Sequence, residues 1–89
     1  MSERYIQNKE IIQSKIGDEV VMMDVESGFY FGLNSVGSVI WSHLSELITL
    51  DELLQKLVSQ FEIDVDTCRK DTADFLDQLL EKKIIRKEP

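Results

Sequence analysis

The chain of 89 residues is poor in the residue types that most catalytic and metal sites require. It has one cysteine, Cys68, which excludes an internal disulfide and a cysteine-based metal framework. It has one histidine, His43, whereas a metal site or an acid–base pair requires several such groups close together. With one proline, four glycines and 43% hydrophobic residues, the composition is that of a folded domain rather than a disordered chain.

Several functional motifs are also missing. The apolar runs are too short to cross a bilayer, and the first residues lack the apolar core of a signal peptide. The acidic pairs Asp51/Glu52 and Asp64/Asp66 lack the ligand spacing of a calcium loop, and no glycine-rich phosphate loop is present. We therefore expect a cytoplasmic protein that is not an enzyme, has no catalytic residues, and binds no metal, cofactor or membrane.

Positive charge is almost absent from the middle of the chain. Between Asp18 and Asp66 there are ten acidic residues and one basic residue, and the formal net charge is -7. Basic residues gather near the C-terminal end, at Lys82, Lys83, Arg86 and Lys87. Because a phosphate backbone requires clustered lysine and arginine, the acidic centre argues against nucleic acid as a partner. The acidity either keeps a small protein in solution or attracts a basic partner, and the sequence leaves both open.

Three segments in the first part of the chain predict antiparallel strands. Residues 10–16 are rich in β-branched side chains, and residues 19–25 are apolar on both faces, which is typical of a central strand. A turn at residues 26–28 leads into an aromatic third strand at residues 29–31. Residues 1–9 are mostly polar, and we expect a flexible arm there, followed by a single domain over residues 10–89.

Apolar residues at helical spacing predict three helices after these strands. Asn34-Ser35 is a helix N-cap signal, and Trp41 lies beside the apolar stripe of the first helix. The segment from Thr49 to Glu52 fits a capping box, and the third helix is predicted over residues 66–83. The fold class is therefore α+β, with a three-stranded antiparallel sheet followed by three helices, a set of elements shared with winged helix-turn-helix domains.

The aromatic strand is the strongest functional candidate. No later segment is predicted to pair with its outer edge, and an open edge is either a liability or a docking site for an extended peptide. The alternative is that Phe29, Phe31 and Leu33, which share one face of the strand, only form core with Trp41. From the residues alone, the two interpretations are balanced.

A family resemblance favours the docking site. The run from Ser27 to Asn34, followed by Gly37 and then Ile40-Trp41, resembles the family of pyrroloquinoline quinone biosynthesis protein D. Together with the segments that begin at Gly17 and Thr49 and the apolar pattern from Asp71 to Leu79, the similarity extends over roughly residues 10–86. This family is the stand-alone form of the RiPP recognition element, which binds leader peptides of ribosomally synthesised and post-translationally modified peptides.

The resemblance implies a winged-helix-like fold and a peptide-binding role without catalysis. In the family, the leader adds as an antiparallel strand to the third strand and packs against the third helix. Carried onto this chain, the backbone edge would come from Gly28, Phe29, Tyr30 and Phe31. The helix wall would come from Arg69, Asp71, Thr72, Phe75, Leu76 and Leu79.

The resemblance also implies the partners. These would be a precursor peptide and either a leader peptidase or a radical SAM enzyme of the same pathway. A lasso-peptide pathway is favoured, and a quinone-cofactor-type peptide chaperone is the alternative. A winged-helix regulatory or DNA-binding module is a further alternative, against which stand the acidic side chains Asp71, Asp74 and Asp77 of the predicted third helix.

Overall fold

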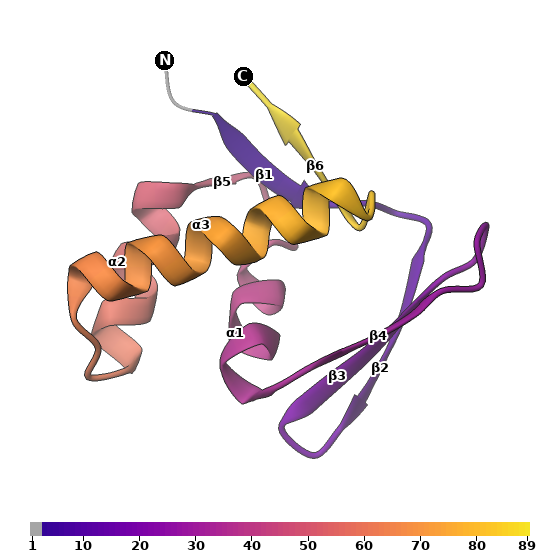
Figure 1. Ribbon diagram of the computed structural model, residues 1–89, viewed down its shortest axis with the longest axis horizontal. Helices are drawn as coiled ribbons and strands as arrows, with labels where there is room; N and C mark the ends of the chain where they lie inside the picture. The colour runs from indigo at the N-terminus through magenta and orange to yellow at the C-terminus, as the bar shows by residue number, and fades with distance from the viewer. Residues whose placement is uncertain (1–2) are drawn as a thin grey trace.

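A computed structural model describes residues 3–89 of the chain (Figure 1). Strands β2 (Ile11–Ile16), β3 (Glu19–Asp24) and β4 (Tyr30–Leu33) form an antiparallel sheet in the order β2-β3-β4. The three predicted strands and the central place of the second are confirmed. The third strand begins at Tyr30 rather than Phe29, because a loop precedes it in which Gly28 has a φ of +72°, a value that favours glycine.

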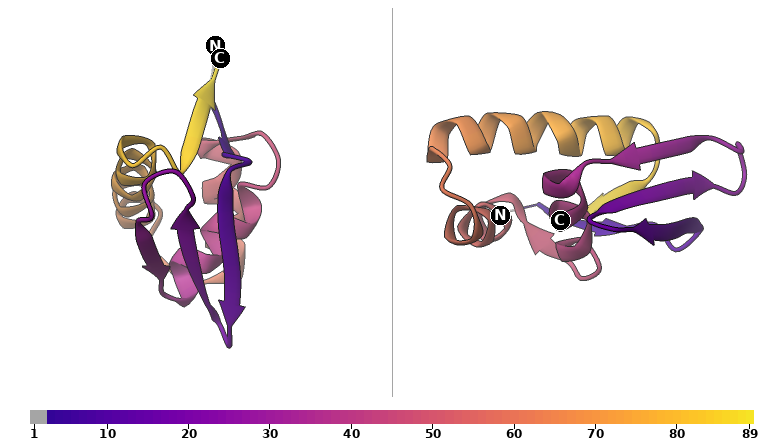
Figure 2. Two further views of the ribbon diagram at one scale, coloured as in Figure 1. Left: turned by 90° about the vertical axis from the view of Figure 1, so that its right-hand side faces the viewer. Right: turned by 90° about the horizontal axis from the view of Figure 1, so that it is seen from below.

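A second sheet corrects the prediction of a single one. Strand β1 (Arg4–Gln7) pairs antiparallel with both β5 (Ile48–Thr49) and β6 (Ile85–Glu88), so the first and last strands lie side by side (Figures 1 and 2). The flexible arm expected for residues 1–9 is therefore wrong for residues 4–7, while residues 1–2 lie outside the described part. The backbone hydrogen bonds of β1 go to segments more than forty residues away along the chain, so no local sequence pattern predicts them.

The three predicted helices are confirmed as α1 (Ser35–His43), α2 (Leu50–Gln60) and α3 (Val65–Glu81). The Asn34 side chain accepts a hydrogen bond of 2.8 Å from the Gly37 N–H, which caps α1 as predicted. Helix α3 ends two residues before the predicted end at residue 83, because Lys83 adopts a φ of +60° and turns the chain into β6. No helix among the described residues is long and apolar enough to span a bilayer.

The core lies between the inner face of the β2-β3-β4 sheet and the helices. Val20, Met22 and Leu33 enter it from the sheet, and Trp41 of α1 is buried at its centre. The Trp41 indole N–H donates to the Gln13 side chain at 2.7 Å, which satisfies a buried donor from strand β2. Ser38 stands between two strands: its hydroxyl accepts from the Val20 N–H at 3.0 Å and donates to the Leu33 carbonyl at 3.3 Å.

The capping box of α2 leads to a prediction about acid stability. The Thr49 N–H donates to the Glu52 carboxylate at 3.0 Å, and the Glu52 N–H donates to the Thr49 hydroxyl at 3.1 Å. These bonds, the Thr49 backbone bond first, hold the pKa of Glu52 below its ordinary value of 4.5. Because the folded pKa is the lower one, the carboxylate stabilises the fold above pH 4.5, and this contribution is lost as the pH falls through the folded pKa.

We therefore expect Glu52→Ala to lower the urea midpoint of unfolding at pH 7 and to have a smaller effect at pH 3. Parallel urea titrations of both proteins at the two pH values measure this difference. Glu62→Ala is the control, since Glu62 is also exposed but precedes α3 outside any capping box. An equal effect of Glu52→Ala at both pH values would contradict the assignment.

Candidate functional site

The site begins at the outer edge of β4. This strand is the last in the β2-β3-β4 sheet, and no strand among residues 3–89 pairs with its outer side. Figure 2 shows α3 alongside β4, with β3 and β2 progressively farther from the helix. Helix α3 and strand β4 run antiparallel to each other. The open edge of the sheet therefore faces a helix across a gap.

The register identifies which backbone groups point into this gap. The Asp24 N–H donates to the Phe29 carbonyl at 2.9 Å, while the Asp24 carbonyl accepts from the Gly28 N–H, so the backbone groups of Asp24 point toward β4 at the bonded position of the ladder. Bonded and non-bonded pairs alternate in an antiparallel ladder, which makes Met22 and Phe31 the next bonded pair. The intervening residues, Tyr30 and Gly32, therefore direct their N–H and C=O groups away from β3. The contact of Val20 with Ser38 at the other end of β4 agrees with this alternation.

Two cavities lie along the gap between β4 and α3, and Phe31 lines both of them. The first, which we call the Lys82 cavity, has a volume of about 550 Å³ and lies at the C-terminal end of α3, with Met22, Phe29 and Ile84 among its walls. The second, the Phe75 cavity, has a volume of about 340 Å³ and lies toward the N-terminal end of α3. We call the two cavities and the β4 edge together the β4–α3 groove.

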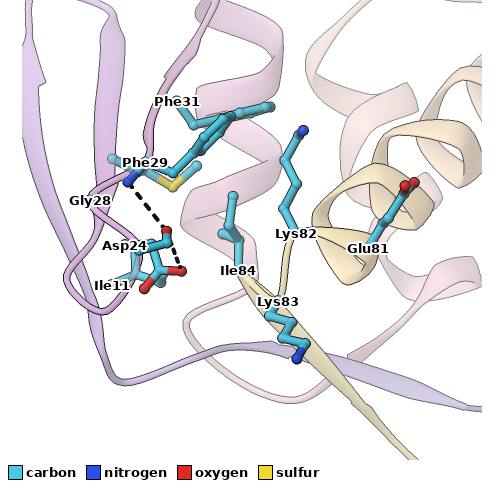
Figure 3. A pocket seen from close by; sticks show the side chains of 11 residues that line it. Ile11, Asp24, Gly28, Phe29, Phe31, Glu81, Lys82, Lys83 and Ile84 are labelled. Carbon is cyan, nitrogen blue, oxygen red and sulfur yellow. Dashed lines mark hydrogen bonds between the residues drawn. The ribbon is translucent and has the colours of Figure 1, made fainter.

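Lys82 spans the groove at one end. Its ammonium lies 4.9 Å from the ring centre of Phe29 and 5.8 Å from that of Phe31, and the two rings lie 6.4 Å apart. Figure 3 shows both rings pointing toward Lys82, whereas the side chains of Glu81 and Lys83 point away from them. A cation over aromatic faces is held by weak electrostatic attraction, which an exposed lysine exchanges readily for a carboxylate.

Gly37 shapes the Phe75 cavity. A Cβ atom at this position would lie 3.4 Å from the Phe75 ring and 3.3 Å from the side-chain oxygen Oδ1 of Asn34. Glycine thus allows Phe75 of α3 to approach the first turn of α1 while Asn34 caps that turn. The cavity is consequently walled by α1, α3 and the end of β4 together.

Six of the ten binding residues predicted from the sequence line the groove. Gly28, Phe29 and Phe31 line the Lys82 cavity. Phe31 also lines the Phe75 cavity, along with the remaining three, Asp71, Thr72 and Phe75. Phe29 is 46% exposed, so the aromatic surface of the groove is accessible. The structure thus brings both predicted walls together, and their role in binding stays a prediction.

The other four lie elsewhere. Leu76 and Leu79 are 1% and 0% exposed, because their side of α3 packs into the core. Arg69 pairs with Asp51 of α2 at 3.2 Å, on another side of α3. The Tyr30 side chain is 70% exposed on the outer face of the sheet, where Met23 is its cross-strand neighbour. Tyr30 therefore contributes backbone groups to the groove, whereas the other three side chains line neither cavity, and their role in binding stays a prediction.

The sequence analysis missed Lys82 and Ile84 at one end of the groove and Asn34 and Ile63 at the other. For Lys82, the helical spacing of the sequence could have predicted a place in the groove. Asp71, Phe75, Gln78 and Lys82 are spaced by four, three and four residues, which places them on one stripe of α3 and its C-cap. The helix wall implied by the family resemblance stopped at Leu79 and included Leu76, and both of these side chains lie in the core. No group of three or more metal-ligating side chains occurs within residues 3–89.

Known proteins resemble this chain in sequence and in fold. Residues 19–85 match the family described as coenzyme PQQ synthesis protein D (PqqD). No curated protein matches the sequence. Among solved structures, the chain is similar to TbiB1 in complex with the TbiA(beta) leader peptide, with 33% identity and a TM-score of 0.84, over 91% of this chain and 94% of that one.

A second structure is also similar. It is a lasso peptide synthetase B1 complexed with the leader peptide, with 23% identity and a TM-score of 0.81, over 92% of this chain and 96% of that one. At this identity the likeness shows the fold.

Proposed function

The chain belongs to the PqqD family, and from this premise we propose that it binds the leader segment of a ribosomally synthesised precursor peptide and presents it to a processing enzyme. The observation that carries the proposal is the open, outward-bonding edge of β4 beside α3. The similar protein TbiB1 is described in complex with a leader peptide. Binding and presentation need no bond-making step, so we propose a recognition protein rather than an enzyme.

The geometry gives each part of the groove a task. The N–H and C=O groups of Tyr30 and Gly32 hydrogen-bond a peptide strand whatever its side chains are, which supplies affinity. Alternate side chains of that strand point to the inner face of the sheet, where the Lys82 and Phe75 cavities receive them. Burial of apolar side chains against Phe31 and Phe75 then selects one leader over others.

The pathway is proposed from the neighbours. Both similar structures contain leader peptides, and one is a lasso peptide synthetase B1, which favours a lasso-peptide pathway with a leader peptidase as the receiving enzyme. A quinone-cofactor-type chaperone for a radical SAM enzyme is the second candidate, because the matched family is described by coenzyme PQQ synthesis. In either pathway the protein would act in the cytoplasm, which stays a prediction.

A winged-helix module that binds DNA is the weaker alternative. The relation to winged helices stays a prediction from the order of elements. The exposed side of α3 carries Asp71, Asp74 and Asp77, and these would repel a phosphate backbone. A peptide strand has no such backbone charge, and the groove therefore fits it better.

We expect a synthetic leader peptide of the cognate precursor to bind with a Kd of about 1 μM or lower, which is about -8 kcal/mol. Isothermal titration calorimetry measures this value, and a scrambled leader of the same composition is the control. Equal binding of the scrambled peptide, or no heat at high micromolar concentration, would overturn the proposal.

A further inference from the structure

The groove-facing stripe of α3 is charged at both ends. Asp71 lies at the Phe75 cavity and Lys82 at the Lys82 cavity, with Phe75 and Gln78 between them on the same stripe. Eleven residues of helix separate the two charges, a distance of about 16 Å along the axis. Neither Asp71 nor Lys82 forms an ion pair with any residue of the described range 3–89. The groove thus has a negative end and a positive end.

The carbonyl groups at the C-terminal end of α3 do not neutralise the charge of Lys82. Carbonyl groups at the end of α3 carry partial negative charge when they are free. Here the carbonyls of Gln78, Leu79 and Leu80 accept hydrogen bonds from the backbone N–H groups that follow the helix. The Asp24 carboxylate at the same cavity already accepts from the Glu26 N–H at 3.1 Å and the Ser27 hydroxyl at 3.0 Å. Lys82 is therefore the charged group that points at the aromatic floor (Figure 3).

Because a peptide strand has a direction, this arrangement of charges favours one orientation of the bound peptide over the other. A peptide that pairs antiparallel with β4 runs the same way as α3, since α3 and β4 run in opposite directions (Figure 2). Its N-terminal residues then lie near Asp71 and its C-terminal residues near Lys82. A strand rises about 3.3 Å per residue, so the two charges lie about five residues apart along the peptide. Because side chains alternate between faces, two that both reach α3 are separated by four or six residues.

We propose that the groove selects a leader with a basic side chain at Asp71 and an acidic side chain four or six residues later at Lys82. The inference rests on the proposed function and adds to it the charge pattern of the bound peptide. Reversed pairing would place the acidic side chain against Asp71 and the basic one against Lys82, and both contacts would be repulsive. The two charges therefore exclude the wrong direction as well as favour the right one.

Matched charge reversals test the proposal, with a synthetic leader peptide of the cognate precursor as the probe. We expect Lys82→Glu and Asp71→Lys each to weaken leader binding roughly fivefold at low salt, and the loss to shrink toward twofold at about 0.5 M salt. Lys56→Glu and Asp77→Lys are the controls, because they make the same charge changes on exposed side chains that line neither cavity. We expect these controls to stay within about twofold of the parent.

A peptide exchange completes the test. Binding of the Lys82→Glu/Asp71→Lys double variant should recover with a leader in which the two facing charged residues are exchanged. Equal losses in variants and controls would mean that only net charge matters, and the inference would be wrong while leader binding stands. If the parent protein binds no leader, the proposed function itself fails, so the two failures are distinguishable.

Discussion

Tyr30→Pro is expected to weaken leader binding by at least about 1 kcal/mol, or roughly fivefold in Kd, without unfolding the protein. The Tyr30 N–H points away from β3, so proline removes a bond to the peptide and none within the sheet. Proline is tolerated at the first residue of an edge strand, which is where Tyr30 lies. Calorimetry measures the affinity, and circular dichroism measures the fold.

The matched control for this prediction is Tyr30→Ala. It keeps the N–H and removes a side chain that is exposed on the opposite face of the sheet, so it should bind like the parent. Phe31→Pro is a second comparison, since Phe31 forms a bonded pair with Met22 and proline there should damage the sheet itself. Parent-like affinity of a folded Tyr30→Pro protein would place the docking edge elsewhere.

Leu76→Asp is expected to unfold the protein rather than to remove binding alone. Leu76 is 1% exposed, and an unpaired carboxylate in its place would cost about 4 kcal/mol or more. A domain of this size is stable by about 5–15 kcal/mol, so a large part of that stability would be lost. Thermal unfolding followed by circular dichroism should show a large fall in the midpoint or no cooperative transition.

Lys70→Asp provides the comparison on the same helix. Lys70 is exposed near the N-terminal end of α3, where an acidic side chain is tolerated, so the effect on stability should stay within about 0.5 kcal/mol. A Leu76→Asp protein that melts like the parent would mean that Leu76 is not core. It would then return this side chain to the groove wall that the sequence analysis predicted.

Local signals in the sequence predicted the elements that frame the groove. The caps at Asn34 and Thr49 rely on hydrogen bonds between residues three apart, and their side chains appear in the sequence beside the helices they begin. The two-residue period of β4 likewise separated Tyr30 from Phe29 and Phe31. Interactions confined to a few neighbouring residues were therefore readable in advance.

Interactions between distant segments could not be predicted from the sequence. Strand β1 has a mixed, largely polar sequence and is held by backbone bonds to β5 and β6, which carry no side-chain signature. On α3, an apolar stripe indicates a buried side without saying which element covers it. The family resemblance placed Leu76 and Leu79 toward a peptide, whereas both side chains lie in the core and the more polar stripe with Lys82 faces the groove.

The hydrogen bonds of Ser38 fix the register of β4 against β3, and with it the backbone groups that β4 presents at its open edge. Its hydroxyl bridges the Val20 N–H and the Leu33 carbonyl, so the end of β4 is fastened to α1 and the strand cannot slip along β3. A slip by one residue would turn Phe31 outward and Tyr30 inward, and would exchange every backbone group on the edge. An incoming peptide therefore meets the same two outward residues, Tyr30 and Gly32, at a fixed distance from both cavities. One buried hydroxyl thus fixes the register against which the side chains of any bound strand align.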